Sequence, residues 1–311
     1  MAKRPRIAVV GSANVDMTTF ADHFPKPGET IFGQKFDLGF GGKGANQATA
    51  SKLCGASVFM VARVGSDLFG PATIENFKKL GIDTTHVKQV QGVSSGVAPI
   101  FVEPNGQNRI FVVKGANDEL KPADVDAAAD LLKAVDCIVL QFEISLETVY
   151  YAVAFARKSG IRCILNPAPG QPIDVKAVSG LDYFVPNESE AETITGMPVK
   201  NIDDAKKCAE KLLSYGIRRV IITLGANGSL LAGKEGVEHL PAFLVKSIDS
   251  TGAGDAFIGS FAVFLGEGLH EREAVRRANL YAGLSTTGVG TQKSFYDRAR
   301  FDAEWASREK A

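Results

Sequence analysis

The chain has 311 residues, of which 45% are hydrophobic and 23% are charged. This balance is typical of a folded globular protein and excludes a chain that is disordered throughout. The 35 basic and 35 acidic residues cancel, so the charge does not favour nucleic acid or an anionic membrane as a partner.

No segment has the length of a membrane span or of an export signal. The longest apolar stretch, Phe257–Leu265, is broken by a glycine and a serine and is much shorter than the ~18 residues of a transmembrane helix. Near the start, basic residues precede only the short run Ile7–Val10, whereas a signal peptide needs ~7–15 apolar residues. We therefore expect a cytoplasmic protein with no membrane partner.

Apolar runs typical of buried strands alternate with helical patterns along most of the chain. The runs are Ile7–Val10, Val58–Val64, Cys137–Phe142, Cys163–Leu165, Tyr183–Val185 and Val220–Leu224. Helical patterns include Ala123–Ala134, Glu147–Lys158 and Asp203–Tyr215. Runs nearly continuous in Val, Ile and Leu suit strands buried on both faces of a parallel sheet. The alternation predicts one doubly wound α/β domain over residues 1–311, with a mostly parallel sheet and helices on both of its faces.

Two segments, Thr30–Phe40 and Gly96–Val113, have no helical period. The second alternates in polarity and contains Asn105-Gly106, a strong hairpin signal. We expect these segments to form a small β-sheet lid, built from insertions near residues 14–40 and 95–115. An edge hairpin of the main sheet is the alternative.

The first glycine-rich segment runs from Gly39 to Gly44 and formally matches G-x-G-x-x-G. It does not follow the first strand, as a dinucleotide-binding loop should, and Gly44 stands where a P-loop needs Ser or Thr. What remains is a flexible glycine turn before a helix that begins near Ala45. Asn46 adds a donor and an acceptor, which suits a polyhydroxylated ligand; a plain tight turn is the alternative.

A second small-residue turn, Ser250–Gly254, opens directly into a helical pattern. Free amides at a helix start bind anions, and the helix dipole reinforces them. Asp255 falls in the first turn of this helix, where a carboxylate acts either as a stabilising charge or as a general base towards a hydroxyl beside a bound phosphate. The residue pattern leaves both roles open.

Polar residues also follow other predicted strands. Asn187 and Glu190 come after Tyr183–Val185, and their oxygens suit either hydrated Mg²⁺ or a helix start. Thr223 begins a glycine turn that ends at Gly228. Asn14 and Asp16 follow the first strand, where an Asx turn is the alternative. In an open α/β sheet, such strand ends line the ligand crevice.

Together these segments resemble the ribokinase (PfkB-type) family of carbohydrate kinases, over nearly the whole chain from Gly11 to about Ser294. The strongest motifs are Gly41–Gln47 (GGKGANQ) and Asp249–Asp255 (DSTGAGD), supported by Leu140–Glu143, Asn166–Pro169 and Pro186–Glu188. The resemblance implies a doubly wound fold whose β-sheet lids clasp two subunits into a homodimer.

The implied reaction is the ATP-dependent phosphorylation of D-ribose at its 5-hydroxyl. Kinases of other small sugars (deoxyribose, fructose or 2-keto-3-deoxygluconate) are the nearest alternatives, and a nucleoside kinase or a silent sugar-binding regulator is more distant. The implied cofactors are ATP, Mg²⁺ and a monovalent cation, K⁺.

The resemblance also assigns residues. The general base is Asp255, with the amides of Gly252, Ala253 and Gly254 in the anion hole. The residues implied to bind the sugar hydroxyls are Asn14, Asp16, Gly42, Lys43, Asn46, Glu143 and Asp255. The residues implied to bind the nucleotide are Asn187, Thr223, Gly225, Gly228, Gly254 and Asn279. Glu190 is implied to bind Mg²⁺ through water. The implied ligands of the monovalent cation are Asp249, Thr251, Ser285, Gly288, Gly290 and Ser294.

The sequence departs from the family at two places. Ser250 stands where Thr is more usual, which is a mild change. Ser294 is followed by Phe295 and Tyr296, where the family often has a proline. We therefore expect the cation loop to be shaped differently from that of its relatives.

Overall fold

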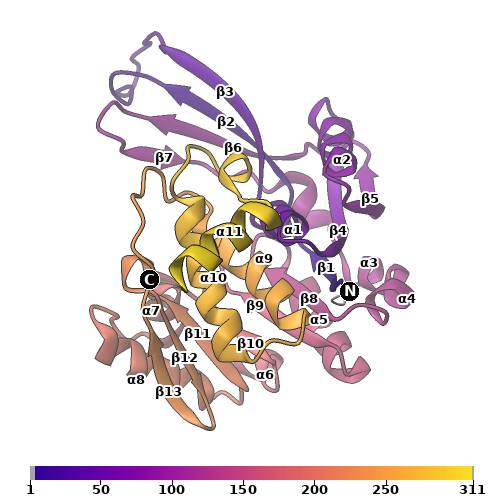
Figure 1. Cartoon of the computed structure of the whole chain (residues 1–311). Helices are drawn as coiled ribbons and strands as arrows, with labels where there is room; N and C mark the ends of the chain where they lie inside the picture. The colour runs from indigo at the N-terminus through magenta and orange to yellow at the C-terminus, as the bar shows by residue number, and fades with distance from the viewer. Residues whose placement is uncertain (1–3, 310–311) are drawn as a thin grey trace.

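A nine-stranded sheet forms the centre of the computed structural model, which describes residues 4–309 (Figure 1). Its strands, in spatial order, are β13 (Gly236–Leu240), β12 (Ser229–Gly233), β11 (Arg219–Thr223), β10 (Tyr183–Phe184), β9 (Arg162–Asn166), β8 (Cys137–Gln141), β1 (Arg6–Val10), β4 (Ser57–Gly65) and β5 (Asp83–Val90). All neighbours are parallel except β11–β12 and β12–β13. The predicted mostly parallel sheet is confirmed, and all six predicted strands lie in it.

Helices cover both faces of this sheet. One face carries α1 (Lys43–Leu53), α2 (Phe69–Lys79), α9 (Ala253–Gly266), α10 (Glu271–Ser285) and α11 (Arg298–Arg308). The other carries α3 (Pro122–Ala127), α4 (Ala129–Leu132), α5 (Leu146–Ser159), α6 (Val175–Val178), α7 (Glu188–Thr195) and α8 (Ile202–Leu213). Alternate residues of a strand point to opposite faces, so Ile7 and Val9 enter one core and Ala8 and Val10 the other.

The predicted helix Ala123–Ala134 is wrong in one respect, because it is divided into α3 and α4. Ala128 lies between them with φ −96° and ψ 5°, outside the helical region. Its amide contacts the carbonyls of both Asp124 and Val125, so the first helix tightens and ends there.

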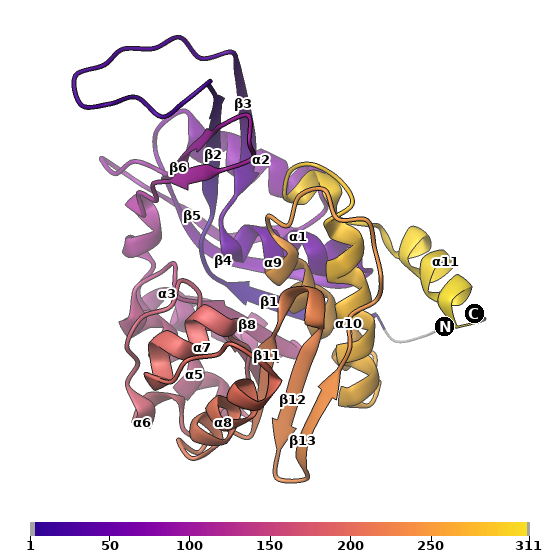
Figure 2. The same ribbon diagram turned by 90° about the vertical axis from the view of Figure 1, so that its left-hand side faces the viewer.

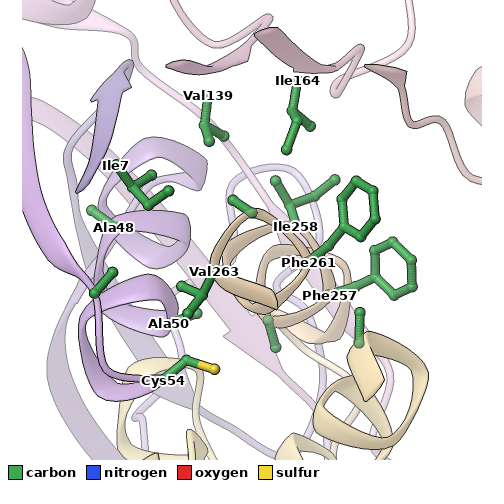
Figure 3. Packing of buried hydrophobic residues seen from close by; sticks show 14 of the residues in the cluster. Ile7, Ala48, Ala50, Cys54, Val139, Ile164, Phe257, Ile258, Phe261 and Val263 are labelled. Atoms are coloured by element: carbon green, nitrogen blue, oxygen red, sulfur yellow. The ribbon is translucent and has the colours of Figure 1, made fainter. Parts of the chain in front are cut away.

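Helices α1 and α9 approach each other closely at the centre of one core (Figure 3). A Cβ atom at Gly259 would lie 2.6 Å from the carbonyl oxygen of Gln47 and 2.7 Å from Cβ of Ala50. Only glycine allows this spacing. The contact brings the first turn of α9 against α1, which decides where Asp255 lies.

A second, four-stranded sheet stands apart at one end of the molecule (Figure 1). Its order is β3 (Lys35–Gly41), β2 (Asn14–Phe20), β6 (Gly96–Val102) and β7 (Asn108–Ile110). β2 is antiparallel to β3 and parallel to β6, and β6 and β7 form the hairpin predicted at Asn105-Gly106. The separate small sheet is confirmed, and the alternative of an edge hairpin of the main sheet is wrong.

Two local predictions in this sheet need correction, and the alternative given for Asn14 and Asp16 is wrong. Residues 30–34 lie outside any strand, in a loop that extends beyond the sheet (Figure 2). Gly39–Gly41 belongs to β3 instead of a flexible turn, and α1 begins at Lys43, earlier than expected. Asn14 and Asp16 lie in β2 instead of an Asx turn. At Gly39–Gly41, Asn14 and Asp16, cross-strand pairing overrides the local preference for turns.

Across residues 4–309, no helix combines the length and apolar character needed to cross a membrane.

Candidate active site

The order of the strands reverses between β1 and β8, and polar side chains gather at their carboxyl ends, as expected at such a switch point. The Ser12 hydroxyl donates to Oε2 of Glu143 at 2.6 Å, and the amide of Lys43 donates to the same oxygen at 2.9 Å. Gly44 permits this contact, since a Cβ there would lie 2.6 Å from the backbone nitrogen and oxygen of Ser12. Glu143 is thereby fixed to the start of α1.

Asn14 and Asp16 lie at the start of β2, close in sequence to Ser12. The Asn14 side-chain oxygen accepts from Nδ2 of Asn117 at 2.7 Å. Asp16 lies against Gly41, where a Cβ would be 2.2 Å from Oδ2 of the carboxylate. Burial, reinforced by the charges of Glu143 and Asp255, raises the pKa of Asp16 to about 7.

Asp255 is the third residue of α9 and is only 7% exposed. Its two oxygens accept hydrogen bonds from neighbouring residues of α1, namely Nδ2 of Asn46 and Nε2 of Gln47, both at 2.9 Å. Burial raises its pKa, while the charge of Lys43 and the two amide hydrogen bonds oppose that rise. The carboxylate therefore stands at a helix start, held by donors on one side.

Lys43 is the cation of this cluster. Burial lowers its pKa, but the carboxylates of Asp255, Glu143 and Glu190 outweigh that effect and leave the pKa above its usual value. The ammonium group is thus charged at neutral pH, as a group that neutralises a phosphate must be.

The turn before α9 offers free amides. Gly252 has φ 79°, and a Cβ there would lie 2.2 Å from Cγ2 of Thr291. Among the described residues, the amides of Gly252, Gly254 and Asp255 have no acceptor, whereas that of Ala253 donates to the Ser250 carbonyl. A helix start with free amides is an anion site.

These groups line a cavity of about 160 Å³. It brings together seven of the predicted site residues: Lys43, Asn187, Glu190, Thr223, Gly252, Gly254 and Asp255. Asn46 and Glu143 do not line the cavity but hydrogen-bond residues that do. Asn46 donates to Asp255, and Glu143 accepts from the Lys43 amide. Ala168, Val185 and Ile258 supply its apolar wall.

Asn187 and Glu190 form a capping box at the start of α7. The Asn187 side chain accepts from the Glu190 amide at 2.8 Å, and Glu190 accepts from the Asn187 amide at 2.9 Å. The helix-start alternative is therefore present in the structure, yet both residues also face the cavity. Burial raises the pKa of Glu190, opposed by the Asn187 amide and by Lys43.

The remaining nucleotide candidates lie beyond Thr223. Gly225 opens the 3₁₀ turn Gly225–Asn227, and Gly228 closes it with φ 88°. Asn279, on α10, donates to the carbonyl of Leu240 at 3.1 Å. These three residues do not line the cavity around Asp255. Gly225 and Gly228 lie between β11 and β12, and Asn279 lies beside the end of β13.

Asp249 joins the two loops assigned to the monovalent cation. Its carboxylate accepts from the amide of Thr251 at 2.9 Å and from that of Gly290 at 3.0 Å. Burial raises its pKa, but these hydrogen bonds outweigh that and leave the pKa below its usual value. Ser294 lies against Gly288, where a Cβ would be 3.1 Å from that of Ser294, while Ser285 is buried at the end of α10.

Several residues of the site are absent from the sequence-based assignment. They are Ser12, Gln47, Asn117, Gln141, Asn166 and Gln292, and each hydrogen-bonds an assigned residue or another of this group. Gln47, Gln141 and Asn166 lie inside motifs that carry the family resemblance, and this was the signal that could have pointed to them.

The comparisons with known proteins agree with this geometry. The model of the pfkB family of carbohydrate kinases matches residues 4–298. The chain belongs to this family. It is 45% identical over 297 residues to a deoxyribokinase of Salmonella typhimurium, covering 95% of this chain and 97% of the relative. It is 40% identical to the ribokinase of Mus musculus, with 93% and 91% covered.

Solved structures of this kinase family have the same fold. The Thermotoga maritima ribokinase is 39% identical, with a TM-score of 0.87 and 96% and 98% of the two chains covered. An Arabidopsis thaliana ribokinase complexed with ribose and ATP is 30% identical, with a TM-score of 0.91 and 97% and 98% covered. The chain is therefore a carbohydrate kinase of the ribokinase type.

Proposed function

We propose that this kinase phosphorylates D-ribose at its 5-hydroxyl with ATP, using Asp255 as the general base. The observation that carries the proposal is the placement of Asp255, a buried carboxylate at the start of α9 beside free amides and the Lys43 ammonium. The ribokinase relatives and the ribose and ATP in the Arabidopsis structure support it.

The reaction needs one proton transfer and one phosphoryl transfer. Asp255 accepts the proton of the sugar hydroxyl, and the hydroxyl oxygen forms its bond to the γ-phosphorus as the bond to the ADP oxygen breaks. Lys43 and the amides of Gly252 and Gly254 stabilise the charge on the transferring phosphoryl group. The remaining work is alignment, for which the closely packed α1 and α9 provide a rigid base.

The sugar occupies the space between the small sheet and α1 in this proposal. Asn14, Asp16, Gly42, Lys43, Asn46 and Glu143 hold its hydroxyls. The nucleotide lies along Asn187, Thr223, Gly225, Gly228, Gly254 and Asn279. Within the described residues no group of three or more His, Cys, Asp or Glu side chains is arranged to hold a metal. The carboxylate of Glu190 on the cavity wall fits a Mg²⁺ ion that keeps most of its waters.

Deoxyribose is a second candidate substrate, because the deoxyribokinase of Salmonella shares 45% of its residues with this chain, against 40% for the mouse ribokinase. The test is a panel of sugars with ATP and Mg²⁺, scored by ADP release. We expect the highest kcat/KM for D-ribose. A higher kcat/KM for deoxyribose would make deoxyribose the substrate in place of ribose. If no sugar stimulates ADP release, the kinase proposal is overturned.

The raised pKa of Asp16 predicts a pH-dependent sugar affinity. A carboxylate accepts hydroxyl hydrogens from the sugar more strongly than a protonated carboxyl, and with a pKa of about 7 the charged form is lost as the pH falls below 7. We expect the Kd for sugar, measured by calorimetry without ATP, to rise several-fold between pH 8 and pH 6. Asp16→Asn should flatten the dependence, and a wild-type Kd that is equal at both pH values would rule out the role.

We also propose a K⁺ site between the loops joined by Asp249, formed by Asp249, Thr251, Ser285, Gly288, Gly290 and Ser294. These ligands fit a cation. The hydroxyls of Ser285 and Ser294 each donate their hydrogen to a backbone carbonyl, so the lone pairs of their oxygens stay available to the ion. An ordered ion there would stiffen the turn of free amides. We expect a higher kcat in K⁺ than in a buffer without alkali ions; equal rates would reject the site.

We propose further that the small sheet pairs with that of a second copy of the chain. Large apolar side chains are exposed on it, with Phe36 at 55%, Ile110 at 50% and Phe111 at 58%. Exposed apolar sheet surface is a liability that a two-fold partner removes. The register places Ile110 on the same face as Thr18 and Asp16 and the next residue, Phe111, on the other.

Light scattering after size exclusion should show a dimer for the wild type. Either Phe111→Asp or Ile110→Lys should give monomers with poorer sugar affinity, and the variant that does so identifies the docking face. A monomeric wild type with full activity would refute the pairing and leave the kinase proposal intact.

A further inference from the structure

A chain of buried side-chain amides lies behind Asp255. Gln47, on α1, is fully buried and donates from Nε2 to Oδ1 of Asp255 at 2.9 Å. The same nitrogen lies 3.2 Å from Oδ1 of Asn166, at the end of β9. On the other side, Gln141 at the end of β8 donates from Nε2 to Oε1 of Gln47 at 2.7 Å. Helices α1 and α9 and strands β8 and β9 thus meet at one amide group.

The neighbours leave this amide a single orientation. Asn166 uses its Nδ2 group for the carbonyl of Val185 at 2.9 Å, so only its oxygen faces Gln47. Gln141 donates to Oε1 of Gln47, while its own Oε1 is buried without a hydrogen-bond partner, so Gln141 favours this orientation of Gln47 and Asn166 enforces it. With both constraints met, the NH₂ group of Gln47 points at Asp255 and cannot exchange places with its oxygen without opposing acceptor to acceptor.

We propose that Gln47 is a positioning residue, oriented by Gln141 and Asn166, which keeps Asp255 in its proton-accepting form and fixes the direction of its carboxylate. The inference rests on the proposed role of Asp255 as base. Because Gln47 offers only hydrogens to the carboxylate, it favours the ionised form over the protonated one. One oxygen of Asp255 is held from Gln47 and the other from Asn46, which leaves the cavity side free for the hydroxyl proton.

The charges around Asp255 explain why such a donor is needed. Lys43 of α1 is the cation that faces it, whereas three carboxylates, those of Asp16 on β2, Glu143 after β8 and Glu190 on α7, oppose its charge. Burial opposes it as well. Neutral donors stabilise the carboxylate without adding charge to the phosphate site.

The test compares the pH dependence of kcat in three variants at saturating ATP and sugar. Gln47→Met removes the donor at similar volume, and Gln141→Met removes the group that orients it. Ser51→Ala is the matched control, since Ser51 is also buried on α1 and bonds α9, donating to the Gly259 carbonyl at 3.0 Å. If the residues had a purely structural role, all three variants would have a lower Tm, and the pH at which kcat falls on the acid side (the acid limb) would not change.

We expect the acid limb of kcat to move up by about one pH unit or more in Gln47→Met, as loss of one hydrogen bond to a carboxylate implies. The shift should be smaller in Gln141→Met and zero in Ser51→Ala, with plateau rates largely kept. A folded Gln47→Met enzyme with the wild-type limb would overturn the inference. If that variant does not fold, an unmoved limb in Gln141→Met overturns it and a raised limb supports it.

Asp255→Asn, measured in the same series, distinguishes the role of Asp255 as base from the role of Gln47 as positioning residue. If that variant keeps its turnover, the base assignment itself fails. If it is inactive while Gln47→Met titrates as the wild type does, only the role of Gln47 fails.

Discussion

Replacing Asp255 with Asn should abolish most turnover while sugar and ATP still bind. The amide is nearly isosteric with the carboxylate, so the packing of α1 against α9 is kept, but it cannot accept the proton of the sugar hydroxyl. Loss of a general base typically costs ~10²–10⁴-fold in rate. Single-turnover rates at saturating substrates measure the loss, and calorimetry with each ligand alone measures the retained binding.

The matched control is Asp203→Asn. Asp203 also lies in the first turn of a helix, α8, but on the surface and paired with Lys206, so it isolates the effect of a helix-start charge. Its kcat should equal that of the wild type. Near-normal turnover in Asp255→Asn would show instead that Asp255 only stabilises its helix.

Gly254→Val should remove activity without destabilising the fold. Gly254 lines the cavity, and a Cβ there meets no atom within 4 Å, so a larger side chain costs the protein little and occupies the space above the free amides. Removing a single donor of this kind costs ~10²–10³-fold, and since the valine side chain blocks access to the free amides, we expect at least that loss in kcat/KM for ATP. The Tm should stay near that of the wild type.

Gly252→Val provides the contrast two residues earlier. There the backbone has φ 79°, and a Cβ would lie 2.2 Å from Thr291, so this variant should lose stability together with activity. A Gly254→Val enzyme with normal kcat/KM for ATP would show that the phosphate does not approach the amides at the start of α9.

The core of the main sheet can be predicted from the sequence because its strands are buried on both faces. Ile7–Val10 is a continuous apolar run and Val220–Leu224 is interrupted only by Thr223, and such runs have few other places in a folded chain. β5 and β13 lie at the edges of the sheet and carry polar residues, so they have no such pattern. β2 begins among Asn and Asp residues, whose local preference for turns is overcome by pairing with β3 and β6.

The candidate site follows the same logic. Motif residues such as Lys43, Asn187 and Asp255 can be named in advance, and the fold brings them to one cavity. The amides behind Asp255 are different, because Gln47, Gln141 and Asn166 also lie in motifs, but only the packing of α1, β8 and β9 shows that their side chains meet. Contacts that join residues 94 or 119 positions apart have no local signature in a single sequence.

Identification of the reaction product tests the central proposal most directly. The enzyme is incubated with ATP, Mg²⁺ and D-ribose, and the sugar phosphate is examined by ³¹P NMR, using phosphorus–proton coupling to locate the ester. We predict one equivalent of ADP and a phosphate on carbon 5, and no product with Asp255→Asn. A phosphate on another carbon, or ADP released without any sugar phosphate, would contradict the proposal.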